Sequence, residues 1–103
     1  MDRPVLDDAL KDREAILRAF LTADGRLSRI PTKIRKRLVV LNELAQQFDI
    51  GETYDETQVN NILRSWHDDV AALRRYLVEE GFLERRDGLY WRAGGTVGEV
   101  VGT

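Results

Sequence analysis

The chain has 103 residues, of which 43% are hydrophobic and 33% charged, with 16 Lys and Arg against 18 Asp and Glu. This length accommodates one small domain, and a net charge of -2 argues against a strongly cationic protein that coats nucleic acid, although a local basic patch remains compatible. The absence of cysteine excludes disulfides and thiolate zinc sites, and a single histidine disfavours a histidine-rich metal site.

The N-terminal segment carries four acids among its first twelve residues and has no apolar stretch typical of a secretory signal. No apolar run in the chain approaches the roughly 18 residues of a membrane span. We therefore expect a cytoplasmic domain without a membrane partner.

The segment from Val5 to Ala23 is predicted to form a helix, because its apolar residues recur at helical spacing. The charged run Asp12-Arg13-Glu14 interrupts this pattern, so the helix is expected to be broken or only half docked. Gly25 marks its end, since glycine adopts the left-handed conformation at low cost.

A second helix is expected after Pro31, with Thr32 as its N-cap. Its apolar residues recur at spacings of four, three, four and three, which predicts a core helix that ends near Phe48. These residues are Ile34, Leu38, Leu41, Ala45 and Phe48.

The third helix has the clearest start signal, because Asp55 and Gln58 have the spacing of a capping box. Tyr54 is expected to pack on Val59 as in a hydrophobic staple. After a short turn around His67, a fourth helix is predicted to start near Asp68 or Asp69 and to end at Gly81.

A C-terminal β-hairpin is predicted from Asp87-Gly88 between two apolar-containing runs, a strong short-range hairpin signal. A two-residue loop pairs Arg86 with Leu89, Arg85 with Tyr90 and Glu84 with Trp91. The tail from Ala93 to Thr103 contains four glycines and no basic residue, so it is expected to be disordered.

This order of elements predicts a mainly α fold with a small C-terminal β-hairpin, resembling a winged helix. The third and fourth helices would form a helix-turn-helix, and the hairpin would form the wing. We expect a single domain over residues 1–92, with an N-terminal helical extension over 1–24 and a core over 25–92, followed by the tail 93–103.

Three stretches resemble, in the same order, the bacterial family called domain of unknown function 2087. They are residues 25–41 (GRL…IP…K…KRLVVL), residues 54–63 (YDE…VN…L) and residues 67–92 (HDD…LRRYLV…G…L…R…G…YWR). The resemblance covers roughly residues 20–92. It implies no established activity; members resemble stand-alone domains or C-terminal extensions of helix-turn-helix transcriptional regulators, and this chain resembles the stand-alone form. The implied link to transcription is an association, not a mechanism.

The densest basic run has six cations and no acid: Arg26, Arg29, Lys33, Arg35, Lys36 and Arg37. Four of them fall in the first two turns of the second helix, where the helix dipole disfavours each cation by about 0.3–1 kcal/mol. A bound phosphate or carboxylate would relieve that repulsion. The more common outcome for such runs is a solvated basic face or pairing with acids of the same fold. The nearest acids in sequence are Glu43, Asp49, Glu52, Asp55 and Glu56.

The outward face of the fourth helix carries two acids and one arginine: Asp68, Ala72, Arg75 and Glu79. Acids repel phosphates, so this face is a poor surface for reading DNA. Arg74 is predicted to be a half-buried structural arginine paired with a carboxylate such as Asp69. Arg75 is predicted to pair with Glu79 four residues later.

The hairpin carries three arginines around its turn, Arg85, Arg86 and Arg92, with Tyr90 and Trp91 between them. A basic, aromatic hairpin suits backbone or minor-groove contacts. Equally, one aromatic ring closes the core while the arginines stack on the other ring or remain in solvent.

His67, Asp68 and Asp69 are potential metal ligands by type. Three consecutive residues in a turn rarely converge on one ion, so an aspartate is expected to cap the helix instead. The sequence contains no catalytic motif, and we expect neither enzymatic activity nor a cofactor.

Two hypotheses of function remain open. The first is a transcription-linked domain that contacts nucleic-acid phosphates. Its contact residues would be Arg29, Lys33, Lys36, Arg37, Arg75, Arg85, Arg86 and Arg92. The second is a protein-interaction or dimerisation module that does not bind DNA, which the acids on the fourth helix favour. A weaker third idea is binding of a small anion between Thr32 and Arg37.

Overall fold

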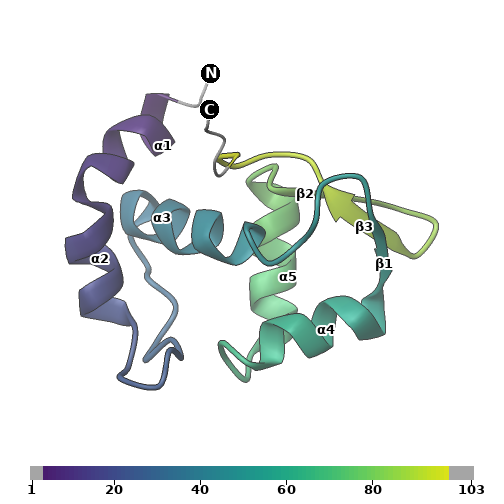
Figure 1. Cartoon of the computed structure of the whole chain (residues 1–103), viewed down its shortest axis with the longest axis horizontal. Coiled ribbons are helices and arrows are strands. Elements are labelled where there is room, and N and C mark those ends of the chain that lie inside the picture. Colours follow the sequence, from purple (N-terminus) through teal and green to yellow (C-terminus); the bar gives the residue numbers. More distant parts are fainter. Residues whose placement is uncertain (1–3, 98–103) are drawn as a thin grey trace.

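The computed structural model describes residues 4–97, which form a mixed α/β domain of five α-helices, a short 3-10 turn and a three-stranded antiparallel sheet (Figure 1). The elements, in chain order, are α1 (Pro4–Ala9), η1 (Leu10–Asp12), α2 (Arg13–Phe20), α3 (Ile34–Ala45), β1 (Thr53–Asp55), α4 (Glu56–Arg64), α5 (Val70–Glu79), β2 (Leu83–Arg86) and β3 (Leu89–Arg92). No helix in this part of the chain is long and apolar enough to cross a membrane.

The predicted interruption of the first helix is confirmed, since η1 separates α1 from α2 where charged residues break the apolar stripe. Both halves nevertheless dock on α3. Leu6, Ile16 and Phe20 are buried in the same core as the rest of the domain. The N-terminal helices are therefore part of the packed structure (Figure 1).

Helix α3 starts and ends differently from the prediction. Its N-cap is Lys33, not Thr32, and no side chain caps it. Lys33 is extended, with φ -79° and ψ 132°, and its carbonyl accepts the first helical hydrogen bond, from the Arg37 amide. The helix ends at Ala45 rather than near Phe48. The amides of residues 46–48 each donate to the carbonyl three residues earlier, as in a 3-10 turn, rather than four residues earlier.

The capping box of α4 is confirmed in both directions. The Asp55 carboxylate accepts from the Gln58 amide, and the Gln58 side chain accepts from the Asp55 amide, each at 2.8 Å. Tyr54 packs edge-on against Phe48, with ring centroids 5.2 Å apart, and its hydroxyl accepts from the Asp49 amide. The contact of Tyr54 with Val59 stays a prediction.

The hairpin register is confirmed, and a third strand joins it. Asp87 and Gly88 both have positive φ, 54° and 80°, as a type I′ turn requires. Strand β1 pairs with β3, so the sheet order is β1-β3-β2. Strand β1 was not predicted, because its partner strand β3 lies more than thirty positions further along the chain; its last residue, Asp55, also caps α4.

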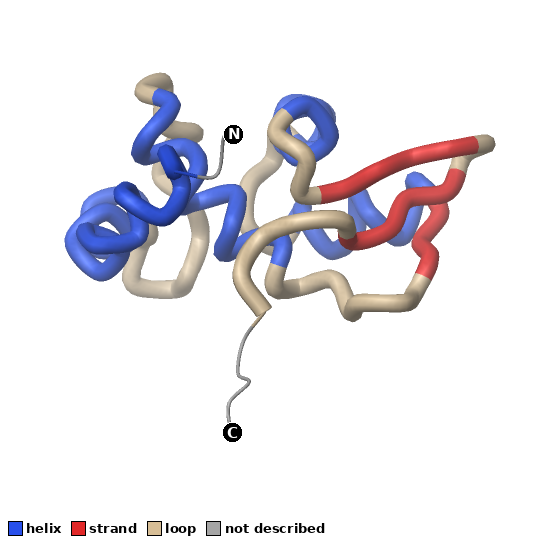
Figure 2. The backbone as a smooth tube through the Cα atoms, turned by 90° about the horizontal axis from the view of Figure 1, so that it is seen from above, coloured by secondary structure: helices blue, strands red, loops and turns tan. Residues whose placement is uncertain are grey.

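The core lies between the helices and one face of this sheet. Helix α3 is its centre, with seven buried residues, and α5 and β3 cover it with Leu73, Leu77 and Tyr90. Seen from above, the sheet extends away from the helices at one end of the molecule (Figure 2). Residues 84–89, which include the turn of the hairpin, are exposed.

The expected disorder of the tail is wrong for residues 93–97. Asn42, which is buried, forms two hydrogen bonds with exposed Thr96, at 2.8 and 3.1 Å, and Gln46 donates to the Thr96 carbonyl. Gly95 has φ +94°, and a Cβ there would lie 2.9 Å from the Asn42 side-chain oxygen, so this close approach requires glycine. Residues 98–103 lie outside the described part of the chain.

Candidate nucleic-acid interface

Much of the basic run before and within α3 is neutralised inside the fold. Arg35 pairs with Asp8 and Asp12 of the N-terminal helices, at 3.2 and 3.0 Å. The hydrogen bond with Asp12, followed by that with Asp8, raises the pKa of Arg35 against the opposing effect of burial. Arg26 donates to the Arg64 carbonyl and to Asp68, at 2.9 and 3.0 Å. The acids that pair with these two arginines are therefore distant in sequence, and none belongs to the nearest acids, which lie between Glu43 and Glu56.

Two other cations of the run lie on aromatic rings. Arg29 lies over Phe20 at 4.7 Å and Arg37 over Tyr76 at 4.4 Å. Arg37 also donates to the carbonyls of Pro31 and Thr32. Its guanidinium therefore supports the loop before α3 and the face of α5.

Lys33 and Lys36 are exposed, and no acid among residues 4–97 pairs with either lysine. They are thus the two cations of the predicted patch that the described fold leaves free. The structure does not gather the six cations into one basic surface.

On α5, Asp69 caps the helix by accepting from the Ala72 amide. The predicted pair of Arg75 with Glu79 is present at 3.8 Å, with both side chains 57% exposed. Arg75 also lies 5.0 Å from the centre of the Tyr76 ring. Its charge thus remains available to solvent.

Arg74 is half-buried, as predicted, but its partners are on α4 rather than Asp69. It donates to Asn60 at 2.6 Å and lies 3.8 Å from Glu56. Asp69 is unsuited to the predicted pair because its carboxylate caps α5. Glu56 also accepts from the Tyr90 hydroxyl, so these contacts fix the inner wall of the space between α5 and the sheet.

The hairpin arginines divide into two kinds. Arg85 lies over the Tyr90 ring at 5.7 Å, and Arg86 is 83% exposed, 3.9 Å from Asp87. In contrast, burial lowers the pKa of Arg92, which donates to the carbonyls of Phe48, Gly94 and Thr96. Arg92 holds the 93–97 segment in place and is structural.

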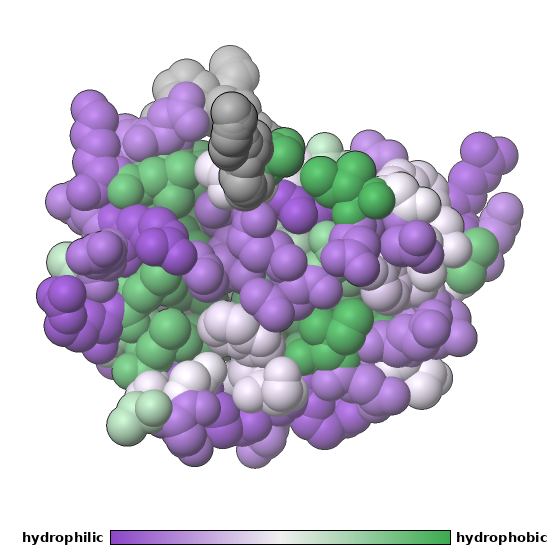
Figure 3. Space-filling view, viewed as in Figure 1, coloured by the Kyte–Doolittle hydropathy of each residue, from purple (hydrophilic) through white to green (hydrophobic). Residues whose placement is uncertain are grey.

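Two hollows adjoin the hairpin and share Val78 and Arg85. The α5–hairpin hollow, about 150 Å³, is lined by Ala71, Arg74, Arg75, Val78, Glu79, Arg85 and Tyr90. The β2-edge hollow, about 520 Å³, is lined by Val78, Gly81, Leu83, Glu84, Arg85, Arg86 and Trp91. Hydrophilic groups project from this end of the molecule in Figure 3.

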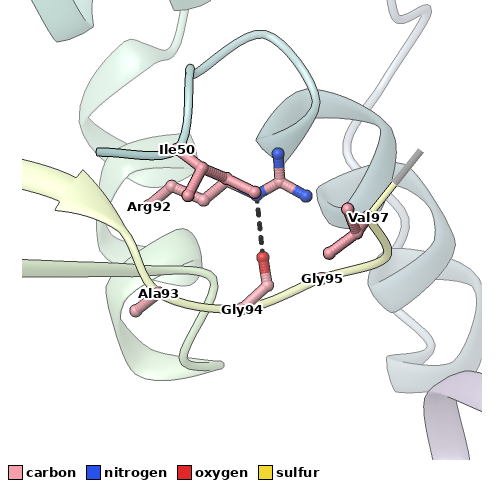
Figure 4. A pocket seen from close by; sticks show the side chains of 6 residues that line it. All are labelled: Ile50, Arg92, Ala93, Gly94, Gly95 and Val97. Carbon is pink, nitrogen blue, oxygen red and sulfur yellow. Dashed lines mark hydrogen bonds between the residues drawn. The ribbon is translucent and has the colours of Figure 1, made fainter. Parts of the chain in front are cut away.

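A third hollow, about 140 Å³, surrounds the Arg92 side chain near exposed Ile50 and Val97 (Figure 4). Figure 4 shows the Arg92 guanidinium bonded to the Gly94 carbonyl. Three carbonyls already accept from the guanidinium, so most of its N–H groups are used within the fold.

The His67 side chain forms a hydrogen bond within the turn between α4 and α5, as expected. Its Nδ1 accepts from the Asp69 amide at 3.0 Å, while Asp69 caps α5. No group of three or more metal-ligating side chains occurs among residues 4–97.

The contacts therefore bring Arg75, Arg85 and Arg86 together around α5 and β2, with Arg74 behind them. Arg37 adjoins this group through Tyr76. Arg29 lies over Phe20 instead, and Lys33 and Lys36 lie on the exposed surface at the start of α3. The Arg92 side chain is bonded to backbone carbonyls within the fold. The hollows were not predicted from the sequence, although the predicted hairpin register correctly paired Arg85 with Tyr90, which both line the α5–hairpin hollow.

These features define a small mixed α/β domain with an arginine-lined surface between its last helix and its sheet. The chain belongs to the family DUF2087, described as uncharacterized protein conserved in bacteria, whose family model matches residues 26–92. This confirms the resemblance over most of its expected range. Neither a curated protein nor a solved structure matches the chain.

Proposed function

We propose that this chain is a non-enzymatic, winged-helix-like domain that binds nucleic-acid phosphates through the surface between α5 and the β2–β3 hairpin. The order of elements supports the fold part of this proposal. Helix α3, strand β1, helices α4 and α5 and the hairpin follow one another, with sheet order β1-β3-β2. In a winged helix, the helix equivalent to α5 and the hairpin form neighbouring parts of one surface.

The observation that carries the proposal is the α5–hairpin hollow, which three arginines from two elements line. They are Arg74, Arg75 and Arg85. Planar guanidiniums donate to phosphate oxygens in pairs, which makes arginine well suited to phosphate binding. Glu79 is the acid of this hollow and is already paired with Arg75.

The family resemblance supports a role linked to transcription by association only. The second candidate is the protein-interaction or dimerisation module, which Glu79 and Glu84 favour because they place acids in both hollows. A surface with both signs of charge suits a protein partner better than a purely cationic one. The two candidates differ in their response to salt.

The test is fluorescence anisotropy with a labelled mixed-sequence duplex and with one of its single strands, at 50 and 200 mM salt. We expect micromolar binding that weakens steeply with salt, because each neutralised phosphate contributes a slope of about 0.7–0.9. Arg75→Ala with Arg85→Ala should reduce the slope by about 1.4–1.8 units.

Lys33→Ala with Lys36→Ala is the matched control, since it removes the same charge from the start of α3. If both double variants lose affinity equally, the binding surface is wrongly placed. If neither form of nucleic acid binds at 50 mM salt, the proposal is wrong. Concentration-dependent association in light scattering would then favour the protein-interaction module.

A further inference from the structure

We infer that the β2-edge hollow receives an unstacked nucleobase, so that the ligand is a nucleotide whose base is unpaired. This inference rests on the proposed function, because the phosphate of that nucleotide would contact the arginines of the α5–hairpin hollow. It specifies single-stranded rather than duplex nucleic acid as the ligand. Phosphate contacts alone do not distinguish between these two.

The lining of the β2-edge hollow combines a flat aromatic side chain with an apolar floor. Trp91 is half-buried, half-buried Val78 and Gly81 contribute further apolar surface, and Leu83 lies fully buried beneath them. A volume of about 520 Å³ falls within the usual range for small-molecule sites. Stacking of a base on an aromatic side chain is the usual way in which proteins hold unpaired bases.

The two hollows are adjacent and are joined by residues that line both. Arg85 and Val78 are these shared residues. Arg85 pairs with Tyr90 on the opposite face of the hairpin from Trp91, so a ligand that spans the junction passes around the β2 edge. It must carry an anionic group beside a flat ring with apolar faces. A nucleotide has this combination, with the phosphate next to Arg75 and Arg85 and the base next to Trp91. An apolar protein side chain would use the floor but leave Arg85, which has no ion pair among residues 4–97, without a counter-charge.

Glu84 gives the hollow a preference among bases. It lies directly opposite Trp91 in the hairpin ladder and lines the same hollow. Side chains of directly paired residues lie on the same face of a sheet. An ionised carboxylate only accepts hydrogen bonds, and the Watson–Crick edge of guanine offers a ring N–H beside an amino group. Thymine offers one N–H between two carbonyl oxygens. We therefore expect guanine to be preferred over thymine.

The experiment measures Trp91 fluorescence in a Trp66→Phe background, because the chain contains only these two tryptophans. The probes are an eight-nucleotide thymidine strand, the same strand with one central guanosine, the duplex of the latter, and free guanosine and thymidine monophosphates. We expect quenching of Trp91 by the guanosine-containing strand, and binding about tenfold tighter than to its duplex.

Two variants assign the effect to the hollow. Glu84→Gln, at an exposed position, should bring the guanosine strand within about twofold of the thymidine strand. Trp91→Leu should lose about tenfold in affinity for both strands, and Trp91→Phe, which retains a stacking ring, should restore most of it. Anisotropy of a labelled strand reports the Trp91 variants, and circular dichroism checks that each remains folded.

The outcomes separate this inference from the proposed function. Duplex binding as tight as strand binding, without quenching of Trp91, overturns the inference and leaves phosphate binding intact. Absence of binding to every probe overturns both. A change in Trp91 fluorescence with protein concentration alone assigns the hollow to a second copy of the chain and overturns the inference. Quenching by guanosine monophosphate at the affinity of the strand supports it and identifies a free nucleotide as the source.

Discussion

Two regions of this domain are rich in arginine but differ in how exposed their arginine side chains are. In the segment 26–37, Arg26 and Arg35 are paired with acids and are 37% and 39% exposed. Around α5 and the hairpin, Arg75 and Arg86 are 57% and 83% exposed, although each lies near an acid of its own element. Arg26 and Arg35 are therefore less available than Arg75 and Arg86, because acids far away in the chain pair with them, whereas Lys33 and Lys36 of the same segment stay exposed.

The largest expected effect comes from removing the N-terminal helices that cover α3. A chain lacking residues 1–25 loses the buried side chains of Leu6, Ile16 and Phe20. At about 1.5–3 kcal/mol each, their loss approaches the whole stability of a typical small domain, about 5–15 kcal/mol. We expect no cooperative urea transition in far-UV circular dichroism. A cooperative transition at the midpoint of the full chain would show that the family segment folds alone.

Local signals predicted most of the fold. The capping box at Asp55, the cap at Asp69 and the Asp87-Gly88 turn were recognisable because each depends on residues at most three positions apart. Strand β1 was missed, since its pairing with β3 joins residues more than thirty positions apart. The placement of residues 93–97 was missed for the same reason, as it depends on buried Asn42.

The candidate site was less predictable than the fold. The sequence identified Arg75, Arg85 and Arg86 as cations but gave equal weight to Arg37 and Arg92, which bind backbone carbonyls. Whether a guanidinium faces solvent or a carbonyl depends on tertiary packing. The pairing of Arg75 with Glu79 was predictable because it is local to one helix.

The second expected effect compares two arginines of the hairpin. Arg92→Met removes the donor to the carbonyls of Phe48 and Gly94, whereas Arg86→Met changes an exposed side chain. We expect Arg92→Met to lower the free energy of unfolding by about 1–3 kcal/mol, because buried acceptors lose their partner. Arg86→Met should change it by less than about 0.5 kcal/mol. Urea denaturation measures both, and equal effects would contradict the structural role of Arg92.

The third expected effect concerns Arg35, which would lose its ion pairs and become available to nucleic acid, like the arginines of α5 and the hairpin. Asp8→Asn with Asp12→Asn removes both carboxylates that pair with Arg35. The freed cation at the start of α3 should raise nucleic-acid affinity a few-fold and increase the salt slope by up to about one unit. Asp7→Asn with Glu14→Gln is the matched control, as it changes net charge equally and leaves the Arg35 pairs intact. Equal gains in both variants would mean that only net charge matters.

The smallest expected effect concerns the turn that leads into the basic segment. The Thr22 hydroxyl donates to the Asp24 carboxylate, and this bond, followed by the backbone amide of Asp24, lowers the pKa of Asp24. A lowered pKa means that the folded state favours the charged form. Its contribution to stability is therefore present above the unfolded pKa and is lost as the pH falls through the folded one.

Thr22→Val should move the pKa of Asp24 back up towards its ordinary value, as read from an NMR titration of its carboxyl carbon. Ser28→Ala, in the same loop, should leave that titration unchanged, because Ser28 bonds to the Phe20 carbonyl instead. An unchanged titration in Thr22→Val would transfer the cause to the backbone amide and to Arg26. Either result measures how strongly local hydrogen bonds, rather than the neighbouring cations, set the electrostatics of this region.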